Sequence, residues 1–259
     1  MIPYLQIQSL SLFGLTFDAF GFLVASGFIV GAHLAARRAR QVGLSVSAIY
    51  DTAILSLIFG FVGAHLFHLA AYRPQLFWKE PWQIFYIWSG LSSFGGFLGA
   101  SMAIAVYFHR KKLSFFSYAD TTMFGLLPGW MLGRIGCFTA HDHPGALTHF
   151  FLAVKYPGGS RHDLGLYEAL VLGMLSCLVY YLNRNKKRTQ GFIFSVAILC
   201  YGGARFFLDF LRARDLPLSD PRYLGLTPAQ YLSVAFVVLG GYRIVKNRER
   251  KKLEDKHAN

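Results

Sequence analysis

The stretch LFGLTFDAFGFLVASGFIVGAHLAA at residues 12–36, followed at once by RRAR at 37–40, indicates the fold class of this chain. A helix needs about 20 predominantly apolar residues to cross the hydrocarbon core of a bilayer. The run is long enough to do so, and Asp18 is its only acidic residue. Arginines directly after an apolar run are typical of a membrane surface. The stretch therefore predicts a transmembrane helix with a basic end.

The same pattern recurs along the whole chain of 259 residues, of which 54% are hydrophobic and 17% aromatic. No polar stretch is long enough to form a soluble domain. The composition predicts an all-α protein, a polytopic membrane bundle of about seven transmembrane helices that forms one domain over residues 1–259. After the run at 12–36, the predicted spans lie near 50–72, 88–108, 115–133, 166–182, 191–211 and 228–246.

The net charge of +13 is distributed unevenly between the two sides of the predicted bundle. Basic residues gather after every second span, and the positive-inside rule assigns such clusters to the cytoplasm. The N-terminus is then outside, and the basic tail at about 246–259 is cytoplasmic. The distribution of basic residues is therefore explained by the orientation of the chain in the membrane, and no nucleic-acid partner is predicted. The clusters are Arg37, Arg38 and Arg40; Arg110, Lys111 and Lys112; Arg184, Lys186, Lys187 and Arg188; and Arg243, Lys246, Arg248, Arg250, Lys251, Lys252 and Lys256. The remaining basic residues are spread over the opposite, outer side; they are Arg73, Lys79, Arg134, Lys155, Arg161, Arg205, Arg212, Arg214 and Arg222.

Two arginines on the predicted outer side are candidates for binding a phosphate. Arg134 ends the fourth span and opens a turn-rich outer loop at about 134–165. Arg205 lies inside the sixth span with Asp209 one helical turn later, so the two share a helix face. A snorkelling arginine and a purely structural ion pair are the alternatives. Guanidinium groups bind phosphate oxygens in a bidentate manner, which favours a phospholipid phosphate as the ligand.

Proton-transfer groups follow Arg134 in GRIGCFTAHDHPG at 133–145. His141 and His143 flank Asp142, and imidazole exchanges protons near neutral pH. The three residues are candidate catalytic groups, although a solvated loop is the alternative. A metal site would need further ligands, for which His149, His162 and Asp163 are available. Their spacing matches no zinc signature, so neither a metal nor another cofactor is predicted.

Other polar residues are candidates for supporting roles. Tyr167 and Glu168 begin the fifth span, as an interfacial aromatic and a first-turn acid or as groups that order the arginines. His65 and His68 in the second span are expected to be buried and hydrogen-bonded. Glycine-rich segments at 89–101 and 200–206 predict spans that pack closely or that break near the membrane surface. In LTPAQ at 226–230, Thr227 is predicted to cap a helix whose first turn contains Pro228.

Taken in order, these motifs resemble the bacterial prolipoprotein diacylglyceryl transferase family over most of the chain. The stretch GRIGCF after LPGWML is the most specific piece. The matching pieces are SGLSSFGGFLGA at 89–100, the segment 108–138 that ends in GRIGCF, LYEAL at 166–170, YGGARFFLDFLR at 201–212 and LTPAQYLS at 226–233.

The resemblance implies seven spans, an outside N-terminus and an inside C-terminus. It implies a multi-pass protein of the bacterial cytoplasmic (inner) membrane with its active site facing the outer leaflet. The implied reaction transfers the diacylglyceryl group of phosphatidylglycerol to a cysteine thiol of a lipoprotein precursor and releases glycerol phosphate. Arg134 then corresponds to the arginine of the family's signature motif, and Arg205 to its late-span arginine.

The chain departs from the family at several positions. The family's His-Gly-Gly reads Phe94-Gly95-Gly96, so the histidine proposed as the family's base is absent. The asparagine after the signature arginine is replaced by Cys137, and a later glutamate corresponds to Asp142. The remaining differences are Phe20 for a tyrosine, His65 for an arginine and Asp209 for a glutamate.

These departures leave three functions open. The first is the family's transfer to a precursor or to another thiol acceptor, with the base relocated to the His-Asp-His segment. The second is a phospholipid-headgroup hydrolase that activates water. The third is a non-catalytic lipid-binding protein, which has no need of the two histidines.

Overall fold

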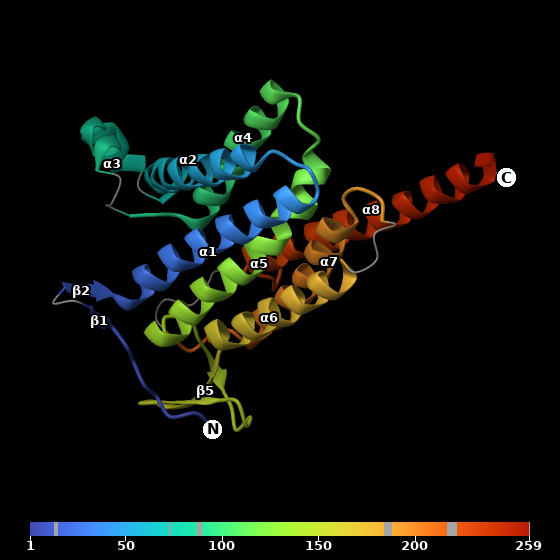
Figure 1. Ribbon diagram of the computed structural model, residues 1–259. Coiled ribbons are helices and arrows are strands. Elements are labelled where there is room, and N and C mark those ends of the chain that lie inside the picture. The colour runs from blue at the N-terminus through green and yellow to red at the C-terminus, as the bar shows by residue number, and fades with distance from the viewer. Residues whose placement is uncertain (13–14, 73, 87–89, 184–187, 217–221, 259) are drawn as a thin grey trace. The chain divides into compact units, whose positions relative to one another are not determined.

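A computed structural model describes residues 1–12, 15–72, 74–86, 90–183, 188–216 and 222–258 (Figure 1). Helices dominate this part of the chain, which confirms the predicted helical class. Four basic residues counted above, Arg73, Arg184, Lys186 and Lys187, lie outside the described residues. The long helices are α1 (Ala19–Gln41), α2 (Val46–Tyr72), α4 (Ser93–Lys111), α5 (Phe115–Ala140), α6 (Leu164–Leu182), α7 (Phe192–Leu208) and α8 (Pro228–Ala258).

Within the part of the chain that the structure describes, four helical segments are long and apolar enough to cross a membrane. They are Ala19–Gln41, Val46–Ala70, Leu164–Leu182 and Phe192–Leu211. The last of these joins α7 to the short 3₁₀ helix η2 (Asp209–Leu211). The apolar helices are consistent with a membrane bundle, while the predicted number of spans and their orientation stay predictions.

Two small sheets accompany the helices and were not predicted. Strands β1 (Ser9–Leu12) and β2 (Leu15–Asp18) pair antiparallel ahead of α1. Strands β3 (Pro144–Leu147), β4 (Val154–Tyr156) and β5 (Gly159–Asp163) form an antiparallel sheet in the order β3-β5-β4.

The expectation of an irregular loop from residue 134 was wrong. Helix α5 continues through Arg134 to Ala140, and most of the following segment is the β3-β5-β4 sheet. The apolar pattern ended at Arg134, but the helix did not, and a carboxylate from α6 pairs with that arginine. The end of a helix is set by its backbone conformation, and the hydrophobicity of the sequence alone does not indicate where that end lies.

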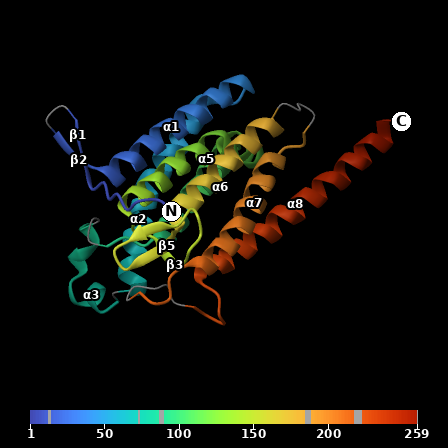
Figure 2. The same ribbon diagram turned by 90° about the horizontal axis from the view of Figure 1, so that it is seen from below.

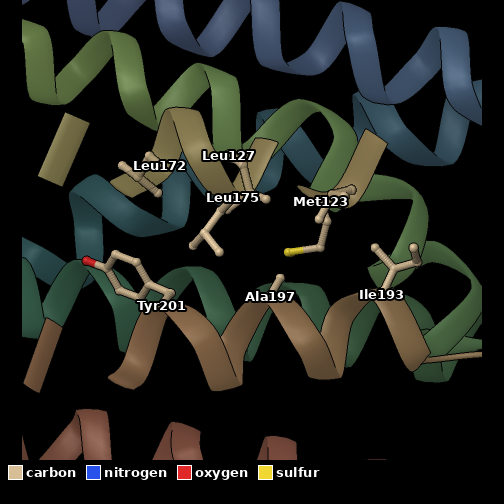
Figure 3. Packing of buried hydrophobic residues seen from close by; sticks show 8 residues of the cluster. Met123, Leu127, Leu172, Leu175, Ile193, Ala197 and Tyr201 are labelled. Atoms are coloured by element: carbon tan, nitrogen blue, oxygen red, sulfur yellow. The ribbon is translucent and has the colours of Figure 1, made fainter. Parts of the chain in front are cut away.

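The chain forms two compact units, residues 1–38 with 119–259 and residues 39–118, and each is described by itself. In the first unit α5, α6 and α7 enclose the apolar core (Figure 3). Met123 and Leu127 of α5 meet Leu172 and Leu175 of α6, while Tyr201 of α7 lies at one end of the cluster. The apolar face of each helix is thereby buried against the other two.

Successive helices of the first unit run in alternating directions. Near the end of α1, Arg38 donates to Asn183 at the end of α6 over 2.5 Å. Asp120, near the start of α5, accepts from the backbone N–H of Phe194 near the start of α7 over 2.7 Å. At the opposite end of α5, the carbonyl of Thr139 accepts from the N–H of Ile7, which precedes α1. Alternation is the arrangement that short connections between neighbouring spans require.

Glycines bring the helices of this unit into backbone contact. A Cβ on Gly27 of α1 would lie 2.3 Å from the carbonyl oxygen of Gly129 of α5, and one on Gly125 would lie 1.9 Å from that of Gly31. Helices α7 and α8 pack side by side in the same way, with Gly202 against the Ser233 carbonyl (Figure 2). Small residues four positions apart allow such close approach in membrane helices.

In the second unit α2 packs along α4. Gly63 of α2 meets Gly95 and Gly99 of α4 so closely that a Cβ on Gly95 would lie 2.4 Å from the Gly63 carbonyl oxygen. This confirms the close packing expected of the glycine-rich segment at 89–101. His65 is 1% exposed and contacts two carbonyl oxygens, Gln83 through Nε2 at 2.8 Å and Gly90 through Nδ1 at 3.3 Å. It is the buried, hydrogen-bonded histidine that was predicted.

Candidate active site

Glu168 of α6 is the centre of a buried ionic network. Its carboxylate is 0% exposed and meets arginines from two other helices. Arg134 Nε of α5 lies 3.0 Å from Oε2 as an ion pair, and Arg205 of α7 donates through Nη1 to Oε1. The hydroxyl of Tyr201 donates to Oε2 over 3.3 Å. Because one carboxylate accepts both guanidinium groups, Arg134 and Arg205 are held close together.

Asp209 extends the network beyond Arg205. Its Oδ1 lies 3.3 Å from Arg205 Nη2 and accepts from Arg212 Nε over 2.7 Å. Its Oδ2 accepts from the hydroxyl of Thr227, the residue that precedes α8. The predicted pairing of Arg205 with Asp209 is confirmed.

Three guanidinium groups meet two carboxylates in this network. They belong to Arg134, Arg205 and Arg212, and the carboxylates are those of Glu168 and Asp209. Guanidinium groups form charge-assisted, bidentate hydrogen bonds with phosphate oxygens, so a cluster of this kind is chemically suited to an anionic phosphate.

His141 closes the end of α5. Its backbone has φ of +53°, the left-handed conformation, and its N–H bonds the Phe138 carbonyl. The imidazole is 7% exposed and stacks on Tyr4 with ring centroids 4.4 Å apart. Nδ1 lies 2.9 Å from Asp163 Oδ2, and the buried Nε2 has no hydrogen-bond partner among the described residues. The side chain thus ties the end of α5 to the start of α6.

Asp142 and His143 pair with each other and lie beside the thiol of Cys137. His143 Nδ1 lies 2.5 Å from Asp142 Oδ1, and both side chains are partly exposed. The thiol of Cys137, in the last turn of α5, lies within 4.8 Å of ligand atoms of both. Arg134 Nη1 approaches the same sulfur at 3.8 Å. These contacts place Asp142 and His143 beside the thiol of Cys137, and that thiol lies next to Arg134 of the network.

The sheet next to this segment holds polar side chains in fixed partnerships. Asp163 caps α6 by accepting from the Leu166 N–H, and it also accepts from the hydroxyl of Tyr156 over 2.8 Å. Burial, together with the charge of Asp163, raises the pKa of Tyr156, so this hydroxyl remains a donor. Burial lowers the pKa of His162, whose Nδ1 lies 2.9 Å from the hydroxyl of Tyr167.

In the central strand β5, Arg161 forms a bidentate pair with Asp215, at 3.0 and 2.5 Å. The guanidinium lowers the pKa of the Asp215 carboxyl below its usual range. Among the described residues, neither Arg161 nor Asp215 pairs with a member of the Glu168 network, which makes Arg161 a suitable control position.

Several predicted residues lie elsewhere. Gly95, Gly96 and His65 belong to the unit of residues 39–118 and serve helix packing there. Phe20 lies against Gly136 of α5, with its ring 3.2 Å from where a Cβ would be. The positions of these residues are described, but no role in binding or catalysis follows from them.

Sequence reasoning missed three members of the network. Arg212 was counted only as an outer-side charge, although its spacing of three from Asp209 on a helix was a usable signal. Thr227 was predicted only as a helix cap. Tyr201 reaches Glu168 across 33 residues of sequence, and no local pattern indicates such a contact.

The fold and this site define a helical protein whose apolar helices suit a membrane and whose interior holds a cluster of arginines and carboxylates. The sequence profile of the prolipoprotein diacylglyceryl transferase family matches residues 8–246, and the chain belongs to that family. It is therefore a membrane transferase of lipoprotein biosynthesis.

Several relatives carry the name phosphatidylglycerol–prolipoprotein diacylglyceryl transferase. The protein of Nitratidesulfovibrio vulgaris strain DP4 is 30% identical, over 92% of this chain and 93% of its own. That of the Miyazaki F strain is 31% identical, over 96% and 97%. The protein of Chromohalobacter salexigens is 30% identical, over 85% and 84%.

Proposed function

We propose that this protein transfers the diacylglyceryl group of phosphatidylglycerol to a cysteine thiol of a lipoprotein precursor, in the bacterial cytoplasmic (inner) membrane and from its outer leaflet. The names of the relatives support the reaction class and the two substrates. The observation that carries the proposal is the buried network around Glu168, whose carboxylate pairs with both Arg134 and Arg205 and so holds the two guanidinium groups close together.

Arg134 and Arg205 bind the phosphate in this proposal. A thiolate sulfur attacks the glyceryl carbon, the carbon–oxygen bond breaks, and its electron pair leaves with glycerol phosphate. The leaving phosphate gains negative charge during this step. Preorganised guanidinium groups stabilise such developing charge more strongly than water does, because they need no reorientation. Glu168 and Asp209 orient the guanidinium groups and hold them in the low-dielectric interior.

The acceptor thiol also has to lose its proton, because the thiolate is the nucleophile. Phe94 has no titratable group at the position of the family histidine. We assign this task to the segment with Asp142 and His143, which is partly exposed and lies beside Arg134 through Cys137. His141 is buried and packed on Tyr4, so in this proposal it holds the turn in place.

The test is turnover of phosphatidylglycerol labelled in its diacylglyceryl part, with purified protein in detergent and a cysteine-containing precursor peptide. The proposal predicts label on the peptide. Label released as diacylglycerol would instead identify a headgroup hydrolase, and no turnover would identify a lipid-binding protein without catalysis.

Arg134→Lys and Arg205→Lys should each lower transfer about 10- to 100-fold. A charge-assisted hydrogen bond is worth about 1.5–3 kcal/mol, and lysine cannot reproduce the bidentate fork. Arg161→Lys is the matched control, since Arg161 pairs with Asp215 outside the network. Near-normal transfer by both network variants would overturn the assignment of the phosphate site.

A further inference from the structure

Three metal-ligating side chains meet at the end of α5, at a place that the phosphate site does not use. Cys137, Asp142 and His143 each offer one ligand atom, and the three atoms lie within 4.8 Å of one another. The further ligands that the sequence analysis considered were His149, His162 and Asp163, and Cys137 was not among them. Asp163 is occupied by His141, Tyr156 and its helix cap, while His162 contacts Tyr167.

The backbone explains why these three residues meet. Helix α5 ends at Ala140, and the left-handed His141 reverses the chain so that the next two residues return toward the last helical turn. Two contacts fix the reversal. The His141 imidazole is held by Asp163 and Tyr4, and the His143 carbonyl accepts from the N–H of Leu164 over 3.2 Å. The cluster is therefore built on an anchored turn.

The donor set is a thiolate, an imidazole and a carboxylate, a combination that suits Zn²⁺. With bonds of about 2.0–2.3 Å, the ligand atoms of a tetrahedral site lie about 3.3–3.8 Å apart. Cys137 therefore has to approach slightly, and the Asp142–His143 pair, now at 2.5 Å, has to open. The thiolate and carboxylate charges cancel those of the ion, so Arg134 at 3.8 Å from the sulfur faces no added net positive charge.

We propose that Cys137, Asp142 and His143 bind a zinc ion through three protein ligands and leave a fourth position open for a thiol. Zinc sites with three protein ligands and an open position are typically catalytic, whereas structural sites are closed by four. The exposures agree with an open site, because Cys137 is buried while the side chains of His143 and Asp142 are 27% and 42% exposed.

The use of the open position rests on the proposed function. The acceptor thiol binds the ion as a thiolate, and its proton leaves to water, since a coordinating thiol is deprotonated outright. Its sulfur then forms the bond to the glyceryl carbon as the carbon–oxygen bond breaks and the electron pair departs with the phosphate. The ion thereby supplies the thiolate that Phe94 cannot.

The first measurement is zinc content of the full-length protein after removal of any affinity tag. We expect about one ion per chain, and a chelated sample should regain it from Zn²⁺ alone. Cys137→Ser and His143→Gln should weaken binding by more than about 100-fold, since loss of even an outer-shell partner costs about 10–100-fold. Cys177→Ser and His162→Gln are the controls, on an exposed thiol and on a histidine that contacts Tyr167. Size-exclusion profiles establish that each variant is folded.

Cobalt substitution identifies the ligands. Co²⁺ in the chelated protein should give a sulfur-to-metal charge-transfer band that is absent in Cys137→Ser and present in Cys177→Ser. A short cysteine peptide should shift the spectrum, and its serine analogue should not. Equal zinc binding by wild type and Cys137→Ser, or an unchanged spectrum with the cysteine peptide, would overturn the proposal. If the spectrum shifts but no label reaches the peptide, the proposed transfer fails and the metal–thiol site stands.

Discussion

At the scale of single residues, Glu168 is the position on which the site depends most. It is fully buried and is the shared partner of Arg134 and Arg205. Without its charge, two guanidinium groups from different helices would face each other in a medium of low dielectric constant. Like charges at short distance repel strongly there, so the network holds only while Glu168 is ionised.

Glu168→Gln should therefore lower the free energy of unfolding by about 3–5 kcal/mol, the usual cost of breaking a buried ion pair by removing one partner. Thermal unfolding in detergent measures the change. Tyr201→Phe is the matched control, because it removes a hydroxyl that contacts Glu168 at 3.3 Å and leaves every charge of the network in place, so it should cost about 1 kcal/mol. Equal effects of the two variants would show that the charge of Glu168 does not hold the network together.

At the scale of elements, the start of α8 combines a helix cap with the ionic network. The Thr227 hydroxyl accepts from the N–H of Gln230, and the Gln230 side chain accepts in return from the Thr227 N–H. This reciprocal pair is a capping box, and it confirms the cap predicted from LTPAQ. The same hydroxyl donates to Asp209 and thereby connects α8 to the end of α7.

Thr227→Ala should cost about 2–4 kcal/mol of stability, the sum of a lost cap and of a lost hydrogen bond to a charged group. Thr227→Ser should retain most of it. Thr139→Ala is the matched control, since the Thr139 hydroxyl donates to the Gly136 carbonyl of its own helix and lies outside the network. Thermal unfolding separates the three variants, and an Ala variant as stable as its control would refute the coupling of cap and network.

At the scale of the whole molecule, the question is the direction in which each helix crosses the membrane. Within the unit of residues 1–38 and 119–259, Arg38 and Asn183 lie together at one end of the helices. Each adjoins one of the basic clusters on which the topology prediction is based. The alternating helix directions and the alternating charge are thus consistent with each other, although neither fixes the side of the membrane.

Reporter fusions test the topology directly. The positive-inside rule predicts cytoplasmic signals for fusions after Arg40, Lys112, Arg188 and Lys252. A fusion at Gly158, in the exposed turn between β4 and β5, should report the outer side. A cytoplasmic signal at Gly158 would place the candidate site in the wrong compartment for a reaction in the outer leaflet.

The sequence by itself determined the features that depend on near neighbours in the chain. The apolar runs predicted the helices, the spacing of Arg205 and Asp209 predicted their pairing, and LTPAQ predicted the cap at Thr227. Helical periodicity and capping are local, so composition and spacing suffice to read them.

Only the tertiary structure decided which helix faces meet. It brought Arg205 to Glu168 across 37 residues of sequence, continued α5 past Arg134, and reversed the chain at His141 so that Asp142 and His143 return to Cys137. The physical reason is that a buried charge selects its partner by the packing and rotation of helices. Glycine contacts and core side chains set that rotation here. A local pattern of charges in the sequence does not predict those contacts.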